Sequence, residues 1–250
     1  MKTSSIISNL SSFLQSRFEN RNYFACVYGS YSYGKYKQKS DIDLFIAIEK
    51  YDKNDFKKTK EFIVNLHKNN DLKLDNEVLY ENKLFIDYKD LEKAVFLCGL
   101  ILANNRFIVP RVIKTKKFLA SIKIKRRLIL NALTSPHIYI GSDDKFYKRI
   151  KNLAERNITL LAIDMIDSSS FTIKDLIKKL YKSESGLEEE FYLGYKKYDL
   201  VKNYLKSILV KEVKTLTEKS DIIKNNNTFS ITNHKSLRIL KNVFKKYEHA

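Results

Sequence analysis

The sequence predicts an α+β protein, with a small α/β domain at residues 1–90 followed by an all-α domain at residues 91–250. In the first part, short runs of β-forming apolar residues alternate with segments whose apolar residues recur at helical spacing. In the second part, one helical pattern follows another. Apolar residues make up 44% of the 250 residues, which is enough to bury a core.

The elements of the first part follow from the spacing of its apolar residues. Apolar positions at helical intervals predict two helices, and runs rich in aromatic and β-branched residues predict two strands. A third strand is predicted within 72–80, and 83–87 fits either a continuation of that strand or a hairpin arm. In chain order, the helices and first two strands are predicted at 4–18 (helix), 23–28 (strand), 42–48 (strand) and 54–69 (helix). We therefore expect a small mixed sheet with helical cover.

Capping patterns and periodicity predict the elements of the second part. Thr172 stands three residues before Asp175, a variant of the capping box, and Ser185 stands three residues before Glu188, the standard form. Each pattern predicts that a helix begins there. The remaining predictions are one long helix or two over 186–212, a loop over the Asn-rich segment 220–233, and an amphipathic helix over 234–247.

Composition indicates a cytoplasmic protein with no membrane partner. No segment approaches the roughly 20 uninterrupted apolar residues of a membrane helix. Polar residues interrupt the apolar positions of the N-terminal segment at helical spacing, which is typical of an amphipathic helix rather than a signal peptide. The two cysteines, Cys26 and Cys98, lie in apolar segments and are predicted to be buried free thiols. With no Cys/His cluster, a zinc site is not expected.

Positive charge is concentrated in the second part of the chain. Residues 1–92 hold 15 basic and 14 acidic side chains, whereas the remaining residues hold 32 and 15. A general bias toward Lys codons would spread the charge more evenly. The second part is therefore where a polyanion would be attracted.

The segment 27–46 (VYGSYSYGKYKQKSDIDLFI) carries the residues with the clearest chemistry. A predicted strand ends in Gly29-Ser30, and a second strand begins ten residues later with Asp41 and Asp43. Alternation along a strand places both carboxylates on one face. Neighbouring carboxylates repel each other unless a divalent cation lies between them, which predicts Mg²⁺, a hard ion that prefers oxygen ligands. A Gly-Ser turn allows backbone amides and a hydroxyl to approach a phosphate.

This segment resembles the signature of the DNA polymerase beta-like nucleotidyltransferase superfamily. That signature is a hydrophobic residue and Gly-[Gly/Ser], a spacer of about a dozen residues, then Asp-hydrophobic-[Asp/Glu]-hydrophobic; VYGS and DIDL match it. The resemblance covers about 20 residues directly, and the order of elements extends it to about residue 90. It implies that Asp41 and Asp43 bind the metals and that Gly29 and Ser30 hold the triphosphate. Lys39 and Ser40, at the end of the spacer, are also predicted to contact the nucleotide.

Members of this superfamily usually have a third carboxylate on a later strand. The candidates are Asp75 and Glu77, which alternate onto one face of the predicted strand as Asp41 and Asp43 do. We favour Glu77, because its surroundings resemble the Glu-bearing strand of the small antibiotic-modifying members, while Asp75 stays open. The resemblance implies two Mg²⁺ ions (or Mn²⁺) and an NTP, with ATP favoured. A hydroxyl activated near Glu77 would attack the α-phosphorus and release pyrophosphate.

A basic segment suggests what the acceptor is. No acidic residue occurs between Glu92 and Asp143, while ten basic residues do, most of them in 111–127. Such a segment is either the solvated face of an amphipathic helix or a surface for a phosphate backbone. The second interpretation favours an anionic acceptor, such as an RNA or tRNA end or a nucleotide. The residues assigned to nucleic-acid binding are Arg111, Lys114, Lys117, Lys125, Arg126 and Arg127.

Other acceptors and one other class of function stay open. The two-part layout also resembles aminoglycoside adenylyltransferases, although a basic domain suits a polycationic drug poorly unless Glu188, Glu189 and Glu190 line a local acidic pocket. The segment from Gly29 to Leu44 resembles the corresponding loop of enzymes that make cyclic oligonucleotides. The alternative of another class is a non-catalytic nucleic-acid-binding protein, or a toxin–antitoxin component on the same fold. The oligomeric state is not predicted.

Overall fold

A computed structural model describes twelve helices and strands of the chain. They form two compact units, residues 1–93 with 135–150 and residues 94–134 with 151–250. The residues described are 2–34, 40–74, 84–92, 95, 132–164, 166, 170–182 and 199–232. In the first unit the elements are α1 (Lys2–Arg17), β1 (Tyr23–Tyr28), β2 (Asp43–Ile48), α2 (Lys53–Asn69), β3 (Phe85–Asp87) and β4 (Ile138–Gly141). The others are α6 (Asp144–Asp164), which extends from the first unit into the second, then β5 (Ser170–Phe171), α7 (Ile173–Lys182), α9 (Asp199–Glu218), β6 (Ile222–Asn225) and β7 (Thr228–Ile231).

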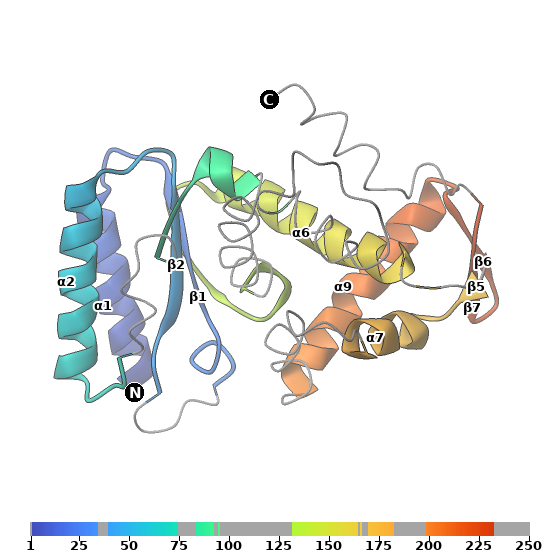
Figure 1. Cartoon of the computed structure of the whole chain (residues 1–250), viewed down its shortest axis with the longest axis horizontal. Coiled ribbons are helices and arrows are strands. Elements are labelled where there is room, and N and C mark those ends of the chain that lie inside the picture. Colours follow the sequence, from blue (N-terminus) through green and yellow to red (C-terminus); the bar gives the residue numbers. More distant parts are fainter. Residues whose placement is uncertain are drawn as a thin grey trace, which may run out of the picture. The chain divides into compact units, whose positions relative to one another are not determined.

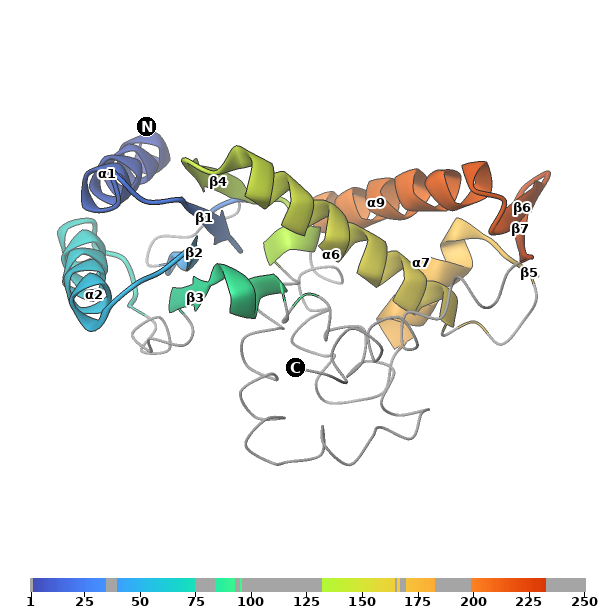
Figure 2. The ribbon, with the colours of Figure 1, turned by 90° about the horizontal axis from the view of Figure 1, so that it is seen from above.

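The first unit contains a four-stranded mixed sheet in the order β3-β2-β1-β4. Strand β1 pairs antiparallel with both β2 and β4, while β2 and β3 are parallel and are connected through α2. Helices α1 and α2 lie side by side against one face of the sheet (Figures 1 and 2). The predicted α+β class and mixed sheet are confirmed.

The core of the first unit lies between the two helices and the sheet. Helix α1 contributes Ile6, Leu10 and Leu14 at intervals of four residues, which places them on one face, and each is at most 2% exposed. Strands β1 and β2 contribute the alternate residues that face this helical layer, such as Val27 and Ile46. Burying side chains of this kind contributes about 1.5–3 kcal/mol each, so the amphipathic pattern is sufficient to hold α1 on the sheet.

The strands outside the first pair differ from expectation. Residues 72–74 are not in a strand, and the rest of the strand predicted at 72–80 lies outside the described residues. Within the segment 83–87, residues Phe85–Asp87 form β3, which pairs parallel with β2. Strand β4 was not predicted, because its four residues lie within a region of otherwise helical pattern.

The second unit is mainly helical, and it also contains a small sheet in the order β5-β7-β6 (Figure 2). Helix α7 begins as predicted: the backbone N–H of Thr172 donates to the Asp175 carboxylate at 2.8 Å, and the Asp175 N–H donates to the Thr172 hydroxyl at 3.2 Å. In contrast, the prediction of a loop at 220–233 is wrong. Residues 222–231 form the β6–β7 hairpin, which turns at Asn226 with φ of 53°, a conformation that Asn tolerates. The helix predicted at 234–247, the Ser185 cap and residues 186–198 lie outside the described residues.

Candidate active site

The sheet brings the two halves of the Gly-Ser and Asp-x-Asp pattern together at one edge. In the antiparallel register of β1 and β2, Tyr28 lies opposite Asp43, so the turn after β1 and the residues before β2 are neighbours. Asp41 and Asp43 are both partly exposed, whereas Ile42 and Leu44 are buried at 2% and 4% exposure. The alternation expected from the sequence therefore holds, and both carboxylates reach solvent.

Gly29 makes the close approach between the two halves possible. Its φ is +73°, in the left-handed region that L side chains rarely adopt. A Cβ built on Gly29 would overlap the Asp43 carboxylate and lie 3.0 Å from its Cγ. A side chain at residue 29 would therefore strain the backbone and would also displace the Asp43 carboxylate.

The turn after β1 leaves Ser30 and Ser32 in different situations. The Ser32 hydroxyl lies 2.9 Å from the Gly29 carbonyl and 2.7 Å from the Pro136 carbonyl, and it can donate to one of them at a time. Among the described residues, no hydrogen bond is recorded for the Ser30 hydroxyl, which is partly exposed. Ser32 thus holds the turn in place, while Ser30 remains available to a ligand.

Tyrosines next to the turn are structural. Tyr31 and Tyr33 are 4% and 8% exposed, and Tyr31 belongs to the core between the sheet and the helices. Tyr28 is 6% exposed; its burial, followed by the negative charges of Asp43 and Asp41, raises the pKa of its phenol well above the usual value. Tyr28 therefore stays neutral, and it lies opposite Asp43 as a buried aromatic residue beside the two carboxylates.

Strand β4 adds a third segment to this edge. Ile138 lies opposite Val27, so the residues before Ile138 lie beside the turn that follows β1, as the bond between Ser32 and Pro136 shows. His137 lies here; its Nδ1 is 2.8 Å from the Ser135 carbonyl and its Nε2 is 2.6 Å from the Tyr147 hydroxyl. No local pattern predicts this proximity, because Ser32 and Pro136 are 104 positions apart in the chain.

Sequence reasoning also missed His67, a buried residue near the end of α2. It is 1% exposed, and its Nε2 accepts a hydrogen bond from the backbone N–H of Ile42 at 3.3 Å. Ile42 is the residue between Asp41 and Asp43. A lone histidine in an amphipathic helix has no pattern that would have revealed this contact.

Several predicted site residues lie outside the described residues. They include both candidates for the third carboxylate. Ser40, in contrast, lies within the described residues and is partly exposed. The residues outside the described ranges are Lys39, Asp75, Glu77, Arg111, Lys114, Lys117, Lys125, Arg126, Arg127, Glu188, Glu189 and Glu190.

The pair of described carboxylates suits a hard divalent cation. Both offer oxygen ligands on one strand face, and the space that a Cβ on residue 29 would fill is taken by the Asp43 carboxylate. Within the described ranges, no three His, Cys, Asp or Glu side chains are grouped closely enough to hold a metal ion. Among the described residues, this edge therefore presents two carboxylates, Asp41 and Asp43.

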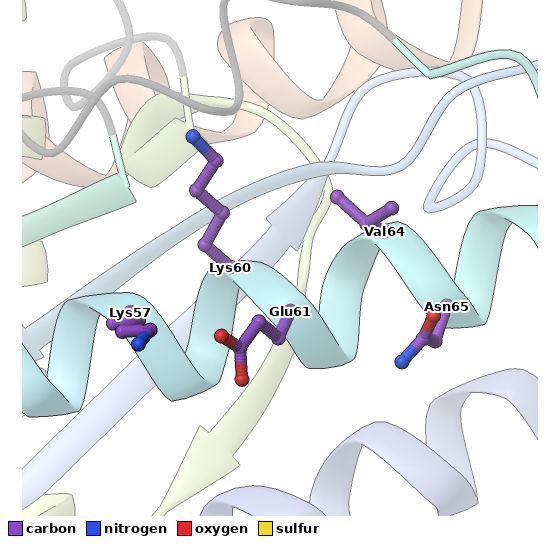
Figure 3. Close-up of a pocket in the computed structure, with 5 residues that line it drawn as sticks. All are labelled: Lys57, Lys60, Glu61, Val64 and Asn65. Carbon is purple, nitrogen blue, oxygen red and sulfur yellow. The ribbon is translucent and has the colours of Figure 1, made fainter.

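A shallow depression lies on α2 and is separate from this edge. It is lined by side chains of α2 alone, none of which is a predicted site residue (Figure 3). These are Lys57, Lys60, Glu61, Val64 and Asn65. An open surface formed by one helix, with mixed charges, has no enclosed volume for a nucleotide.

Comparison with known proteins identifies the class of the first part of the chain. Residues 7–102 match the nucleotidyltransferase domain family, a range that includes β1, the Gly-Ser turn, β2 and α2. No curated protein and no solved structure shows significant similarity to the chain. Residues 7–102 therefore match a nucleotidyltransferase domain of the DNA polymerase beta-like superfamily, as the motif predicted. Such domains transfer nucleoside monophosphates.

None of the helices in the described part of the chain is both long enough and apolar enough to cross a membrane.

Proposed function

We propose that this protein is a metal-dependent nucleotidyltransferase that moves a nucleoside monophosphate from an NTP to an acceptor hydroxyl and releases pyrophosphate. The observation that carries the proposal is the meeting of Gly29 and Asp43 at one sheet edge, within a stretch that matches the nucleotidyltransferase domain family. Each half of the motif is common by itself, but a left-handed glycine packed against the second aspartate of the pair is specific.

The predicted site residues have separate tasks in the proposed reaction. Asp41 and Asp43 would hold divalent cations, and Glu77, or Asp75 in its place, would complete the ligand set or accept the proton of the attacking hydroxyl. The Gly29-Ser30 turn binds the triphosphate through its amides and the Ser30 hydroxyl, with Lys39 and Ser40 beside it. Bound Mg²⁺ or Mn²⁺ would offset the negative charge that develops on the phosphates.

The second unit, residues 94–134 and 151–250, forms the acceptor-binding region in this proposal. Their excess of positive charge favours an anionic acceptor, such as an RNA end or a nucleotide, over a polycationic antibiotic. Helix α9 presents the exposed side chains of Lys202, Lys206 and Lys214, whereas two acidic side chains of the second unit, Glu155 and Glu212, are buried. Sequence-independent contacts to phosphates are the chemistry that such surfaces provide.

Pyrophosphate release provides the test. The protein is incubated with Mg²⁺ and each of the four NTPs, with bulk tRNA, a mixed nucleotide pool or an aminoglycoside panel as acceptor. Release should require Mg²⁺ and an anionic acceptor, with ATP the favoured donor. It should fall at least about a hundred-fold in Asp41→Asn and in Asp43→Asn.

The same variants show whether lost activity reflects lost structure. Both carboxylates are partly exposed and repel each other, so their replacement by Asn should leave the melting temperature unchanged or raise it. Release with aminoglycosides but not with RNA or nucleotides would overturn the acceptor assignment. If no NTP stabilises the protein with Mg²⁺ and no acceptor supports release, the protein is a non-catalytic binding module.

A further inference from the structure

Among the described residues, the backbone N–H of Ile42, between Asp41 and Asp43, has one hydrogen-bond acceptor. Ile42 precedes β2, so its N–H is not part of the antiparallel ladder, which begins with Asp43 opposite Tyr28. Continuing that register would bring Ile42 opposite Gly29, where the chain has already turned away. The acceptor for the Ile42 N–H is Nε2 of His67, at 3.3 Å, and no other acceptor is recorded for it among the described residues.

His67 is itself held firmly in place. Its Nδ1 lies 2.8 Å from the carbonyl of Ile63, one turn earlier in α2, and the ring is 1% exposed. The carbonyl can only accept, so Nδ1 carries the proton and Nε2 is the bare acceptor that faces Ile42. The carbonyl of His67 in turn accepts from the N–H groups of Asn70 and Leu72, at 3.3 and 2.9 Å, which ends the helix.

This arrangement ties the spacing of the carboxylates to the end of a helix. A residue whose N–H is fixed cannot rotate its peptide plane freely, and rotation at Ile42 would turn the side chains of Asp41 and Asp43 away from a common direction. Metal sites need ligand positions held within a fraction of an ångström by the groups behind them. His67 is placed to give that support through the backbone amide of Ile42.

We propose that His67 is a positioning residue for the metal site, holding Asp41 and Asp43 in a common orientation through the Ile42 amide. The proposal rests on the function proposed above for the two aspartates. It assigns to α2 a second task beside covering the sheet.

Three variants separate positioning from folding. His67→Phe keeps a buried ring and removes the acceptor, whereas His67→Gln returns an acceptor oxygen near the position of Nε2. Ile63→Val is the matched control, because it removes one buried methylene from the same helix face and leaves the Ile42 contact intact. Thermal melts of the three variants give the stability change of each.

Two readouts are measured on the full chain, Mn²⁺ affinity from the electron paramagnetic resonance of free Mn²⁺ and hydrogen exchange of the Ile42 amide by NMR. We expect at least a ten-fold loss of Mn²⁺ affinity in His67→Phe, recovery to within about three-fold of wild type in His67→Gln, and no loss in Ile63→Val. The Ile42 amide should exchange slowly in wild type and in His67→Gln, and at least ten-fold faster in His67→Phe.

Failure of this proposal differs from failure of the proposed function. Wild-type Mn²⁺ affinity in His67→Phe, or an equal loss in His67→Gln, would overturn the positioning role. A rapidly exchanging Ile42 amide in the wild-type protein would overturn it whatever the metal does. The proposed metal site is absent if the wild-type protein binds no Mn²⁺, or if Asp41→Asn and Asp43→Asn bind Mn²⁺ as tightly as wild type. In either case the positioning role is also overturned.

Discussion

Two groups of carboxylates in the first unit are built in opposite ways. Asp55, at the start of α2, is 1% exposed and is bound by two guanidinium groups. Arg17 lies 2.7 Å from one of its oxygens and Arg21 lies 2.6 Å from the other. In contrast, Asp41 and Asp43 are partly exposed and lie side by side, and their negative charge reaches the buried Tyr28.

The difference teaches how to tell structural acids from functional ones in this fold. Asp55 also completes a capping box with Asp52, so its charge is fully engaged in holding α2 to α1. Asp41 and Asp43 instead reach solvent at one sheet edge, where a divalent cation lying between adjacent carboxylates would offset their repulsion. We therefore interpret this pair as the acids of the proposed site and Asp55 as an acid of the fold.

The largest effect predicted from this comparison concerns the two glycines of the turn. Gly29 and Gly34 both have positive φ, 73° and 63°. A Cβ on Gly34 has no neighbour within 4 Å, whereas a Cβ on Gly29 overlaps the Asp43 carboxylate. We expect Gly29→Ala to lower pyrophosphate release about a hundred-fold, because a misplacement of about 1 Å at a reacting centre can cost that much.

Gly34→Ala is the matched control for Gly29→Ala. Each substitution strains a left-handed residue by about 1–2 kcal/mol, which urea unfolding measures. If both variants lose activity equally, backbone strain alone explains the loss and the contact with Asp43 is irrelevant. Activity within about three-fold of wild type in Gly34→Ala, beside the large loss in Gly29→Ala, would assign the difference to Asp43.

Sequence predicted the fold wherever a local pattern decided the structure. The strand at 23–28 coincides with β1, and the helices at 4–18 and 54–69 differ from α1 and α2 by one or two residues at the N-terminal end and at most one at the C-terminal end. These elements have clear periodicity and a buried face. Strand β4 and the β6–β7 hairpin are short, and their pairing depends on partners elsewhere in the chain, so their sequences alone carried little signal.

The same distinction holds for the site. The Gly-Ser turn and the Asp-x-Asp pair were predictable because each is a compact motif, and strand alternation gave the shared face of the carboxylates. The contacts of His67 with Ile42 and of Ser32 with Pro136 join residues 25 and 104 positions apart. Such contacts follow from the way α2 and β4 pack, which no spacing in the sequence encodes.

A second prediction tests the structural role of Asp55. Asp55→Asn keeps the shape of the side chain, but two arginines lose their charged partner. Hydration of the two guanidinium groups replaces only part of the lost interaction energy. We expect a loss of about 2 kcal/mol in the free energy of unfolding, with pyrophosphate release unchanged under conditions where the protein is folded.

The exposed Asp71 offers a control of equal charge. It has φ of 53°, which Asn tolerates well, so Asp71→Asn should change stability by less than about 0.5 kcal/mol. If Asp55→Asn and Asp71→Asn proved equally stable, the ion pairs of Asp55 would contribute nothing measurable. A fall in activity without unfolding would instead connect Asp55 to the site.

The pH dependence of stability gives a third prediction from the same residue. Hydrogen bonding from Arg21, aided by the nearby positive charges, lowers the pKa of Asp55 below its ordinary value of 3.8. The unfolded chain therefore takes up a proton at this residue before the folded protein does, and the associated stability, present above about pH 4, is lost as pH falls through the folded pKa.

Urea unfolding at about pH 5 and about pH 3 measures this dependence. The stability lost between these two values should be larger in wild type than in Asp55→Asn, which cannot titrate at this position. Parallel losses in the two proteins would mean that other carboxyl groups carry the acid sensitivity. That outcome would contradict the assignment of Asp55 as the structural acid of this unit.

The smallest predicted effect concerns a polar group that serves neither region. Thr59 lies one helical turn beyond Asp55 in α2 and is 0% exposed, and its hydroxyl has no hydrogen-bond partner among the described residues. Thr59→Val keeps the branched shape and removes the buried hydroxyl, so we expect a gain of about 1 kcal/mol in stability with no change in pyrophosphate release. A loss of stability would show that the hydroxyl is hydrogen-bonded in solution, and a loss of activity would extend the site into the middle of α2, beyond its end at His67.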